Sequence, residues 1–101
     1  EMVLLGDRID AETMATLGLV NKVVPATSLK EETAKLAGRL AKGPTRAYSH
    51  AKRLMYASIN NQLEHQLQLE AEAFADCAGG VDFKEGVTAF VEKRKAVFTG
   101  K

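Results

Sequence analysis

Apolar residues recur at intervals of three and four positions from Leu29 to Val91, and this spacing constrains the fold more than any other feature of the chain. The interval matches the turn of an α-helix, so the members of each set lie on one face. The sequence therefore predicts a mainly α chain with four helical faces in this part: Leu29, Thr33, Leu36 and Leu40; Ala47, Ala51, Leu54 and Met55; Leu63, Leu67, Ala71, Phe74 and Ala78; and the inward-facing Phe83, Val87, Phe90 and Val91.

Short polar residues, glycines and prolines predict where these helices begin and end. Ser28 with Glu31 and Asp82 with Glu85 are capping-box patterns, in which two side chains satisfy free backbone N–H groups. Asn61 is a candidate cap for the third helix. The remaining boundaries are predicted by stops at Gly43 and Gly79-Gly80, by Pro44 in a first turn, by a break at Ile59-Asn60-Asn61, and by an end of the last helix near Ala96.

The first 26 residues carry a different pattern. Gly6 predicts the end of an apolar helix, and Asp10 predicts the start of a short helix that stops at Gly18. The β-branched run from Val20 to Val24, closed by Pro25, predicts one short strand. A strand needs a partner for its backbone groups, and the sequence offers no second strand.

The chain starts at Glu1 without an initiator Met, and apolar residues begin at once. Together with the lone strand, this start favours the interpretation that the chain is the C-terminal part of a longer protein. Removal of a short leader, or a start at Met2, is the alternative.

Composition narrows the classes of function. The chain has 101 residues, 46% apolar and 27% charged, which fits one globular domain or part of one. A formal net charge of +1 argues against binding of nucleic acid by the whole surface, and no apolar run approaches the roughly 20 residues of a membrane span. Cys77 is the only cysteine, so an intrachain disulfide and a thiolate metal cage are excluded. No signal peptide is visible, and a cytoplasmic location is expected.

No set of residues predicts a catalytic or metal site. His50 and His65 have no Cys, Asp or Glu at the spacing that would complete a metal site, so structural roles are favoured. Ser49 and His50 are adjacent in a helix and point apart. Cys77 follows an acidic residue, which disfavours a thiolate. The neighbouring acidic residues, Glu31 with Glu32 and Glu70 with Glu72, are interpreted as solvated.

Lys93-Arg94-Lys95 is the strongest local charge feature. Cations at a helix C-terminus stabilise it through the macrodipole, and this alone would explain the cluster. The functional alternative is a phosphate contact, with Phe74 or Phe90 available to stack on a base. Spacing does not choose between these two interpretations.

Two stretches resemble the crotonase (enoyl-CoA hydratase/isomerase) superfamily. LLGDRIDAETMATLGLVNKVVP is similar to the family pattern in which a helix end and a short helix precede Gly-Leu-Val-Asn-x-Val-Val-Pro, matched here from Gly18 to Pro25. EGVTAFVEKRKAVFTGK is similar to the family's terminal helix. The resemblance covers essentially all 101 residues. It departs at Ala96, where the family often has Pro, and across Cys77 to Asp82, where the family often reads Phe-Ala-Thr-Glu-Asp.

The resemblance implies a C-terminal portion of such an enzyme. Residues 1–26 would be the end of the crotonase core, and residues 27–101 the helical oligomerisation region. The family's oxyanion hole and its carboxylates would lie upstream of Glu1, so the chain alone would be inactive. The implied parent is an enoyl-CoA hydratase or isomerase that acts on a coenzyme A thioester, requires no metal or redox cofactor, and forms trimers or dimers of trimers.

The resemblance also implies ligand contacts. Phe74 and Lys93 match the positions that, in the family, reach the adenine and the phosphate end of coenzyme A. Arg94 and Lys95 would be helix-end charges, Phe90 would belong to the core, and Phe98 could pack against a neighbour. The alternative from another class is a free-standing helical oligomerisation module without catalysis or a coenzyme A contact.

Overall fold

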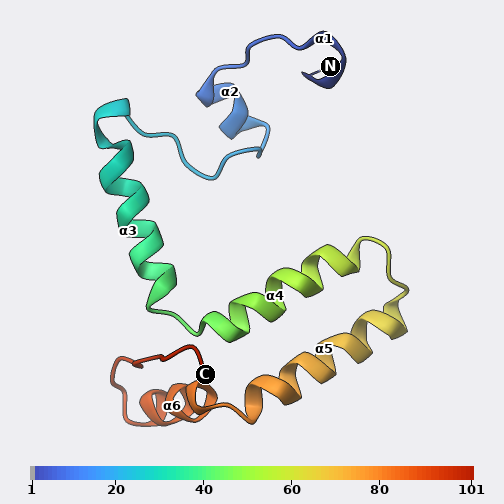
Figure 1. Cartoon of the computed structure of the whole chain (residues 1–101), viewed down its shortest axis with the longest axis vertical. Helices are drawn as coiled ribbons and strands as arrows, with labels where there is room; N and C mark the ends of the chain where they lie inside the picture. Colours follow the sequence, from blue (N-terminus) through green and yellow to red (C-terminus); the bar gives the residue numbers. More distant parts are fainter. Residues whose placement is uncertain (1) are drawn as a thin grey trace. The chain divides into compact units, whose positions relative to one another are not determined.

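The computed structural model describes residues 2–101 and confirms a mainly α chain (Figure 1). Two compact units are present, Glu1–Lys35 and Leu36–Lys101, and each is described by itself. Helix α3 starts in the first unit and ends in the second. The elements are α1 (Met2–Leu5), α2 (Ala11–Thr16), the 3₁₀ turn η1 (Ala26–Ser28), α3 (Leu29–Ala41), α4 (Thr45–Ser58), α5 (Leu63–Ala78) and α6 (Val81–Val91).

Both short helices of the first unit, α1 and α2, end near glycines, as predicted. Gly6 follows α1 with a φ of 69°, and its amide donates to the Met2 carbonyl at 3.2 Å. Asp10 caps α2, because its Oδ1 accepts from the Thr13 amide at 2.7 Å. Gly18 has a φ of 73° in a Schellman turn. A side chain would be strained in these left-handed conformations, which explains why glycine occupies both positions.

The predicted strand from Val20 to Val24 is wrong. This segment is irregular, and no strand occurs among residues 2–101. The physical reason is the one that made a lone strand doubtful: its backbone groups have no ladder to join within the described chain. A side chain anchors the segment instead, since Lys22 Nζ lies 2.5 Å from Glu32 Oε2 in the first turn of α3.

The predicted capping box at Ser28 is also wrong. Ser28 closes η1, which runs directly into α3, so the helix has no open end for a hydroxyl to cap. No side-chain hydrogen bond of Ser28 is present within residues 2–101. The Oε1 atom of Glu31 lies 2.7 Å from Lys35 Nζ and does not contact the backbone N–H of Ser28 as a capping box requires.

In the second unit, the helices α4 and α5 pack against each other (Figure 1). They are separated by the predicted break after Ser58, and Gly43 and Pro44 precede α4 as expected. Asn61, however, does not cap α5. Gln62 is the N-cap residue of α5. The side-chain Nδ2 of Asn61 donates to Gln66 Oε1 at 3.0 Å instead. Small Ala73, 4% exposed, lies buried in this unit.

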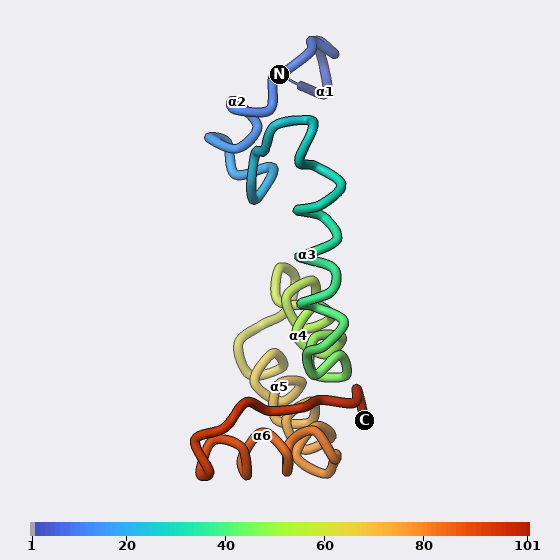
Figure 2. Tube along the Cα trace, turned by 90° about the vertical axis from the view of Figure 1, so that its left-hand side faces the viewer, coloured from blue at the N-terminus to red at the C-terminus, as the bar shows by residue number. Residues whose placement is uncertain are grey.

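Helix α6 is covered by the C-terminal segment, which runs back along it (Figure 2). Gly80, not Asp82, is the N-cap, because the Asp82 carboxylate is occupied by Thr99 and Gly100. The helix ends at Val91 rather than near Ala96, since the chain must turn there to return along the helix.

The predicted inward faces of α5 and α6 are exposed in this chain. Phe74 is 65% and Phe90 85% exposed, so the placement of Phe90 in a core is wrong for the described residues. The buried positions in α6 are Asp82 and Ala89 instead. At about 100° per residue, their stripe lies roughly 135°, more than a third of a turn, from the centre of the predicted one. The C-terminal segment covers the stripe that carries the Asp82 carboxylate. It leaves the large apolar side chains of α6 exposed.

A candidate ligand-contact site on the last two helices

Phe74 lies near the end of α5 and packs edge to face against Phe83 at the start of α6. The ring centroids are 5.9 Å apart and the planes meet at 88°. The short connection through Gly79 and Gly80 brings the two helix ends together. Edge-to-face pairs of this geometry are favourable, and the contact leaves much of Phe74 open to solvent. Phe74 can therefore offer an aromatic surface to a flat ligand.

Lys93 follows the end of α6 in an unusual backbone conformation. Its φ is 54°, the only positive value outside glycine among residues 2–101. The Lys93 amide donates to Phe90 at 3.2 Å and the Arg94 amide donates to Ala89 at 3.0 Å, which is a Schellman turn with Lys93 where glycine is usual. The Lys93 side chain is exposed and makes no ion pair within the described chain.

Arg94 has a role that sequence reasoning missed. It was expected to be only a helix-end charge, but its Nη1 and Nη2 lie 2.6 and 2.8 Å from the two carboxylate oxygens of Glu85. Its Nε also donates to Glu92 at 2.6 Å. Nine positions separate Glu85 from Arg94, so no short-range pattern could have revealed the pair. Lys95 remains an exposed charge, with no ion pair in residues 2–101.

Glu85 is held ionised by this arrangement. The Arg94 guanidinium, followed by the Val97 amide at 2.8 Å, lowers the pKa of Glu85 to about 2. The same contact raises the pKa of Arg94. The pair is therefore charged at any physiological pH and joins α6 to the segment that follows it.

Phe74 and Lys93 are not brought together in one chain. Phe74 touches Phe83 at the start of α6, whereas Lys93 lies beyond the end of that helix. Ten residues at a rise of about 1.5 Å each place Phe83 and Lys93 roughly 15 Å apart along the axis. One ligand could meet both residues only if it were extended, or if the two residues came from different copies of the chain.

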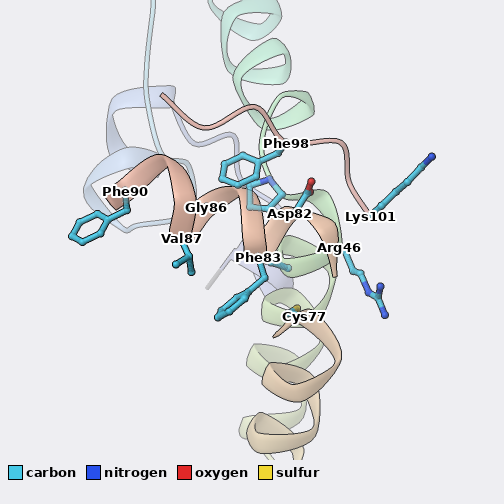
Figure 3. Close-up of a pocket in the computed structure, with 11 residues that line it drawn as sticks. Arg46, Cys77, Asp82, Phe83, Gly86, Val87, Phe90, Phe98 and Lys101 are labelled. Atoms are coloured by element: carbon cyan, nitrogen blue, oxygen red, sulfur yellow. The ribbon is translucent and has the colours of Figure 1, made fainter. Parts of the chain in front are cut away.

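A cavity of about 390 Å³ lies beside Phe83 (Figure 3). Gly86 lines the cavity and has no side chain to fill it. The Phe98 ring lies over this glycine, and a Cβ added at Gly86 would be 3.6 Å from the ring. Phe98 thus packs on its own α6, a contact that differs from the expected packing against a neighbour. The other lining residues are mainly apolar: Pro44, Ala47, Cys77, Val87 and Phe90, with Arg46, Asp82 and Lys101.

His50 belongs to a polar cluster between α4 and α5. Its Nε2 lies 2.6 Å from Asp76 Oδ2, and Arg53 Nη2 donates to its Nδ1 at 3.1 Å, which assigns the proton to Nε2. Arg46 binds both Asp76 oxygens, at 3.0 and 2.5 Å, and lowers the pKa of Asp76 more than His50 does. No hydroxyl or thiol bonds to His50 within residues 2–101, so the predicted structural role fits.

Metal sites and membrane-spanning helices were the other features considered for the described residues. Among residues 2–101, no group of three or more His, Cys, Asp or Glu side chains could hold a metal ion. None of the helices described is both long and apolar enough to cross a membrane. The surface at the last two helices presents an exposed cation, Lys93, and an exposed aromatic face, Phe74.

Comparisons with known proteins identify the family of the chain. Residues 1–101 match the family model of enoyl-CoA hydratase/isomerase. The "Probable enoyl-CoA hydratase" of Rhodobacter capsulatus is 38% identical over 100 residues, which are 99% of this chain and 39% of that protein. The mitochondrial enoyl-CoA hydratase of Pongo abelii is 41% identical over 98 residues, which cover 97% of this chain and 34% of that protein.

The fold is shared as well. A crystal structure of enoyl-CoA hydratase subunit I from Geobacillus kaustophilus superposes with a TM-score of 0.88 at 41% identity, over 95% of this chain and 37% of that one. The chain thus spans less than half the length of the relatives it matches. Because the family match spans residues 1–101 and the sequence and fold similarities support it, the chain belongs to the enoyl-CoA hydratase/isomerase family.

Proposed function

We propose that the chain is the C-terminal helical part of an acyl-CoA-processing enzyme, an enoyl-CoA hydratase or isomerase. The observation that carries the proposal is the family match over all of residues 1–101. Residues 1–26 would complete the catalytic core, and residues 27–101 would cover it and mediate assembly into a trimer or hexamer. The large apolar side chains left open on α5 and α6, such as Leu67 and Val91, fit an assembly role because water disfavours them.

The reaction would be either addition of water across the double bond of an enoyl-CoA thioester or a shift of that double bond along the acyl chain. An oxyanion hole built of backbone N–H groups would stabilise the enolate, and carboxylates would move the proton. Both elements would belong to the part of the enzyme that precedes this chain. The described residues hold no nucleophile paired with a base, which is consistent with that division of roles. The enzyme would require no metal or redox cofactor and would reside in a reducing compartment such as the cytoplasm.

Phe74 and Lys93 would bind the coenzyme A end of the substrate. An exposed aromatic face suits adenine, and an unpaired ammonium suits a phosphate as a compact cation. Because Phe74 of α5 packs against the start of α6 and Lys93 follows the end of that helix, we propose that they meet the ligand from different subunits of the oligomer.

The first test is the intact mass of the purified protein, followed by mapping of its N-terminal peptides. A mass well above 10.9 kDa, with hydration of crotonyl-CoA, would support the proposal. A soluble, monodisperse species of 10.9 kDa would favour a free-standing helical module and contradict it.

A further inference from the structure

We propose that the Glu85–Arg94 ion pair is a positioning device for Lys93, holding its backbone in the left-handed conformation so that its ammonium faces the ligand phosphate. The inference rests on the proposed function for its ligand, and on the contacts of this chain for its geometry. It assigns to Arg94 a role in substrate binding that does not require Arg94 to touch the substrate.

The first step is the backbone at Lys93. The other left-handed helix ends of the described chain use Gly6 and Gly18, with φ values of 69° and 73°. Lys93 has a φ of 54° although it carries a side chain. Strained conformations of this kind persist only where surrounding contacts hold them, and they are typical of functional sites.

The second step is the set of contacts that hold the turn. Glu85 lies within α6, so its carboxylate is fixed by the helix. It accepts from Arg94, directly after Lys93, and from the Val97 amide farther along. The chain after Lys93 is thereby tied at two points to the helix before it, and the turn cannot open without breaking both contacts.

The third step concerns which cation is free to bind an anion. Arg94 uses four of its five N–H donors: one on Glu92, two on Glu85 and one on the Lys95 carbonyl. It therefore has little capacity left for a phosphate. It also pairs with both Glu85 and Glu92, so the charges of these two carboxylates are balanced by Arg94.

The test uses the full-length enzyme and two substrates with the same acyl group. One is the coenzyme A ester, and the other is the pantetheine ester, which keeps the thioester but has no phosphate. We compare KM and kcat for the wild type, Lys93→Met, Arg94→Gln and the double variant. Lys95→Met is the matched control, because it removes a neighbouring exposed cation that the device does not include.

If Arg94 acts through Lys93, both single variants raise KM for the coenzyme A ester by about three- to tenfold with kcat little changed. The pantetheine ester then shows neither rise, the double variant is no worse than the poorer single variant, and Lys95→Met behaves like the wild type. Arg94→Lys, which keeps the charge but not the two-pronged contact, gives an intermediate KM and serves if Arg94→Gln fails to fold.

Four outcomes would overturn the inference. Equal losses on both esters would make Arg94 merely structural. Multiplying effects in the double variant would mean that Arg94 and Lys93 act independently. A normal KM in Arg94→Gln, with a raised KM in Lys93→Met, would reject the positioning role and leave the proposed function standing. An unchanged KM in Lys93→Met would instead reject the phosphate contact itself.

Discussion

Asp82 holds Thr99 through two hydrogen bonds: its Oδ1 lies 2.7 Å from the Thr99 amide nitrogen and 3.1 Å from the Thr99 hydroxyl. Its other oxygen accepts from the Gly100 amide at 2.8 Å. The Thr99 amide is the main cause of a lowered pKa at Asp82, so the carboxylate is charged. At 7% exposed, Asp82 is a buried anion whose partners are mostly backbone N–H groups. It fixes the end of the chain along α6.

Asp82→Asn is expected to release this C-terminal segment, because an amide group offers one acceptor where the carboxylate offers two, and its N–H₂ opposes a backbone donor. Hydrogen exchange at Thr99 and Gly100, followed by NMR, should accelerate about tenfold or more. Asp7→Asn is the control, since Asp7 is exposed and has no hydrogen bond within residues 2–101. Unchanged protection in Asp82→Asn would contradict the anchoring role.

Acid should destabilise both units through their paired glutamates. The folded chain lowers the pKa of Glu32 and of Glu85 from 4.5 to about 2, chiefly through Lys22 and Arg94 respectively. Since the folded pKa lies below the unfolded one, the stabilisation is complete above about pH 5 and is lost as pH falls toward 2. Thermal unfolding followed by circular dichroism should show Tm falling across this window. Glu85→Gln should flatten the fall, and a slope parallel to the wild type would count against the Glu85 contribution.

Lys93→Gly should stabilise the fold while it weakens ligand binding. A residue with a side chain is strained by about 1 kcal/mol in the left-handed conformation, and glycine removes this strain. The gain corresponds to a rise in Tm of roughly 4–8 °C for a domain of this size. The same change removes the ammonium and should raise KM for a coenzyme A ester about three- to tenfold, as expected for Lys93→Met. Lys95→Gly is the control and should lower Tm slightly, because it only adds freedom to the unfolded chain. A lower Tm in Lys93→Gly would refute the strain.

Phe74→Leu should weaken binding of a coenzyme A ester, because leucine keeps apolar bulk but offers no flat face to adenine. We expect KM to rise about tenfold, within the range for loss of base stacking. Phe74→Tyr keeps the ring and should behave like the wild type, and the pantetheine ester should be insensitive to both changes. Equal effects of leucine and tyrosine would argue for a packing role of Phe74 alone.

Ala73→Leu should destabilise the second unit by about 1–3 kcal/mol, because Ala73 is 4% exposed and a larger side chain must displace its neighbours. Ala71→Leu, at an exposed position of the same helix, should change Tm little. Thermal unfolding of the three proteins measures the difference. Equal Tm values would show that the two positions are equally open.

Local structure was predictable where the decisive contacts span a few residues. The Asp10 cap joins residues three apart, and the stops at Gly6 and Gly18 depend on a positive φ that glycine adopts freely. The errors fall where partners are distant. Asp82 has the sequence signature of a cap, but Thr99, seventeen positions away, occupies its carboxylate.

The candidate site likewise has features that local sequence indicated and features that it did not. The resemblance to the family implied that Lys93 and Phe74 are ligand contacts, and that assignment stays a prediction. Nothing local indicated that Arg94 would bind Glu85, or that Lys93 would adopt a left-handed backbone, because both follow from the return of the chain along α6.

By itself, the sequence determined that the chain is helical, where most helices stop, and which family it belongs to, because caps, glycines and motifs act over one or two turns. Only the tertiary structure decided which positions of α5 and α6 are buried. The 3.6-residue period marks apolar faces, but it does not say what will cover them. In α6, hydrogen bonds from the end of the chain selected the stripe of Asp82 and Ala89 and left Phe90 exposed.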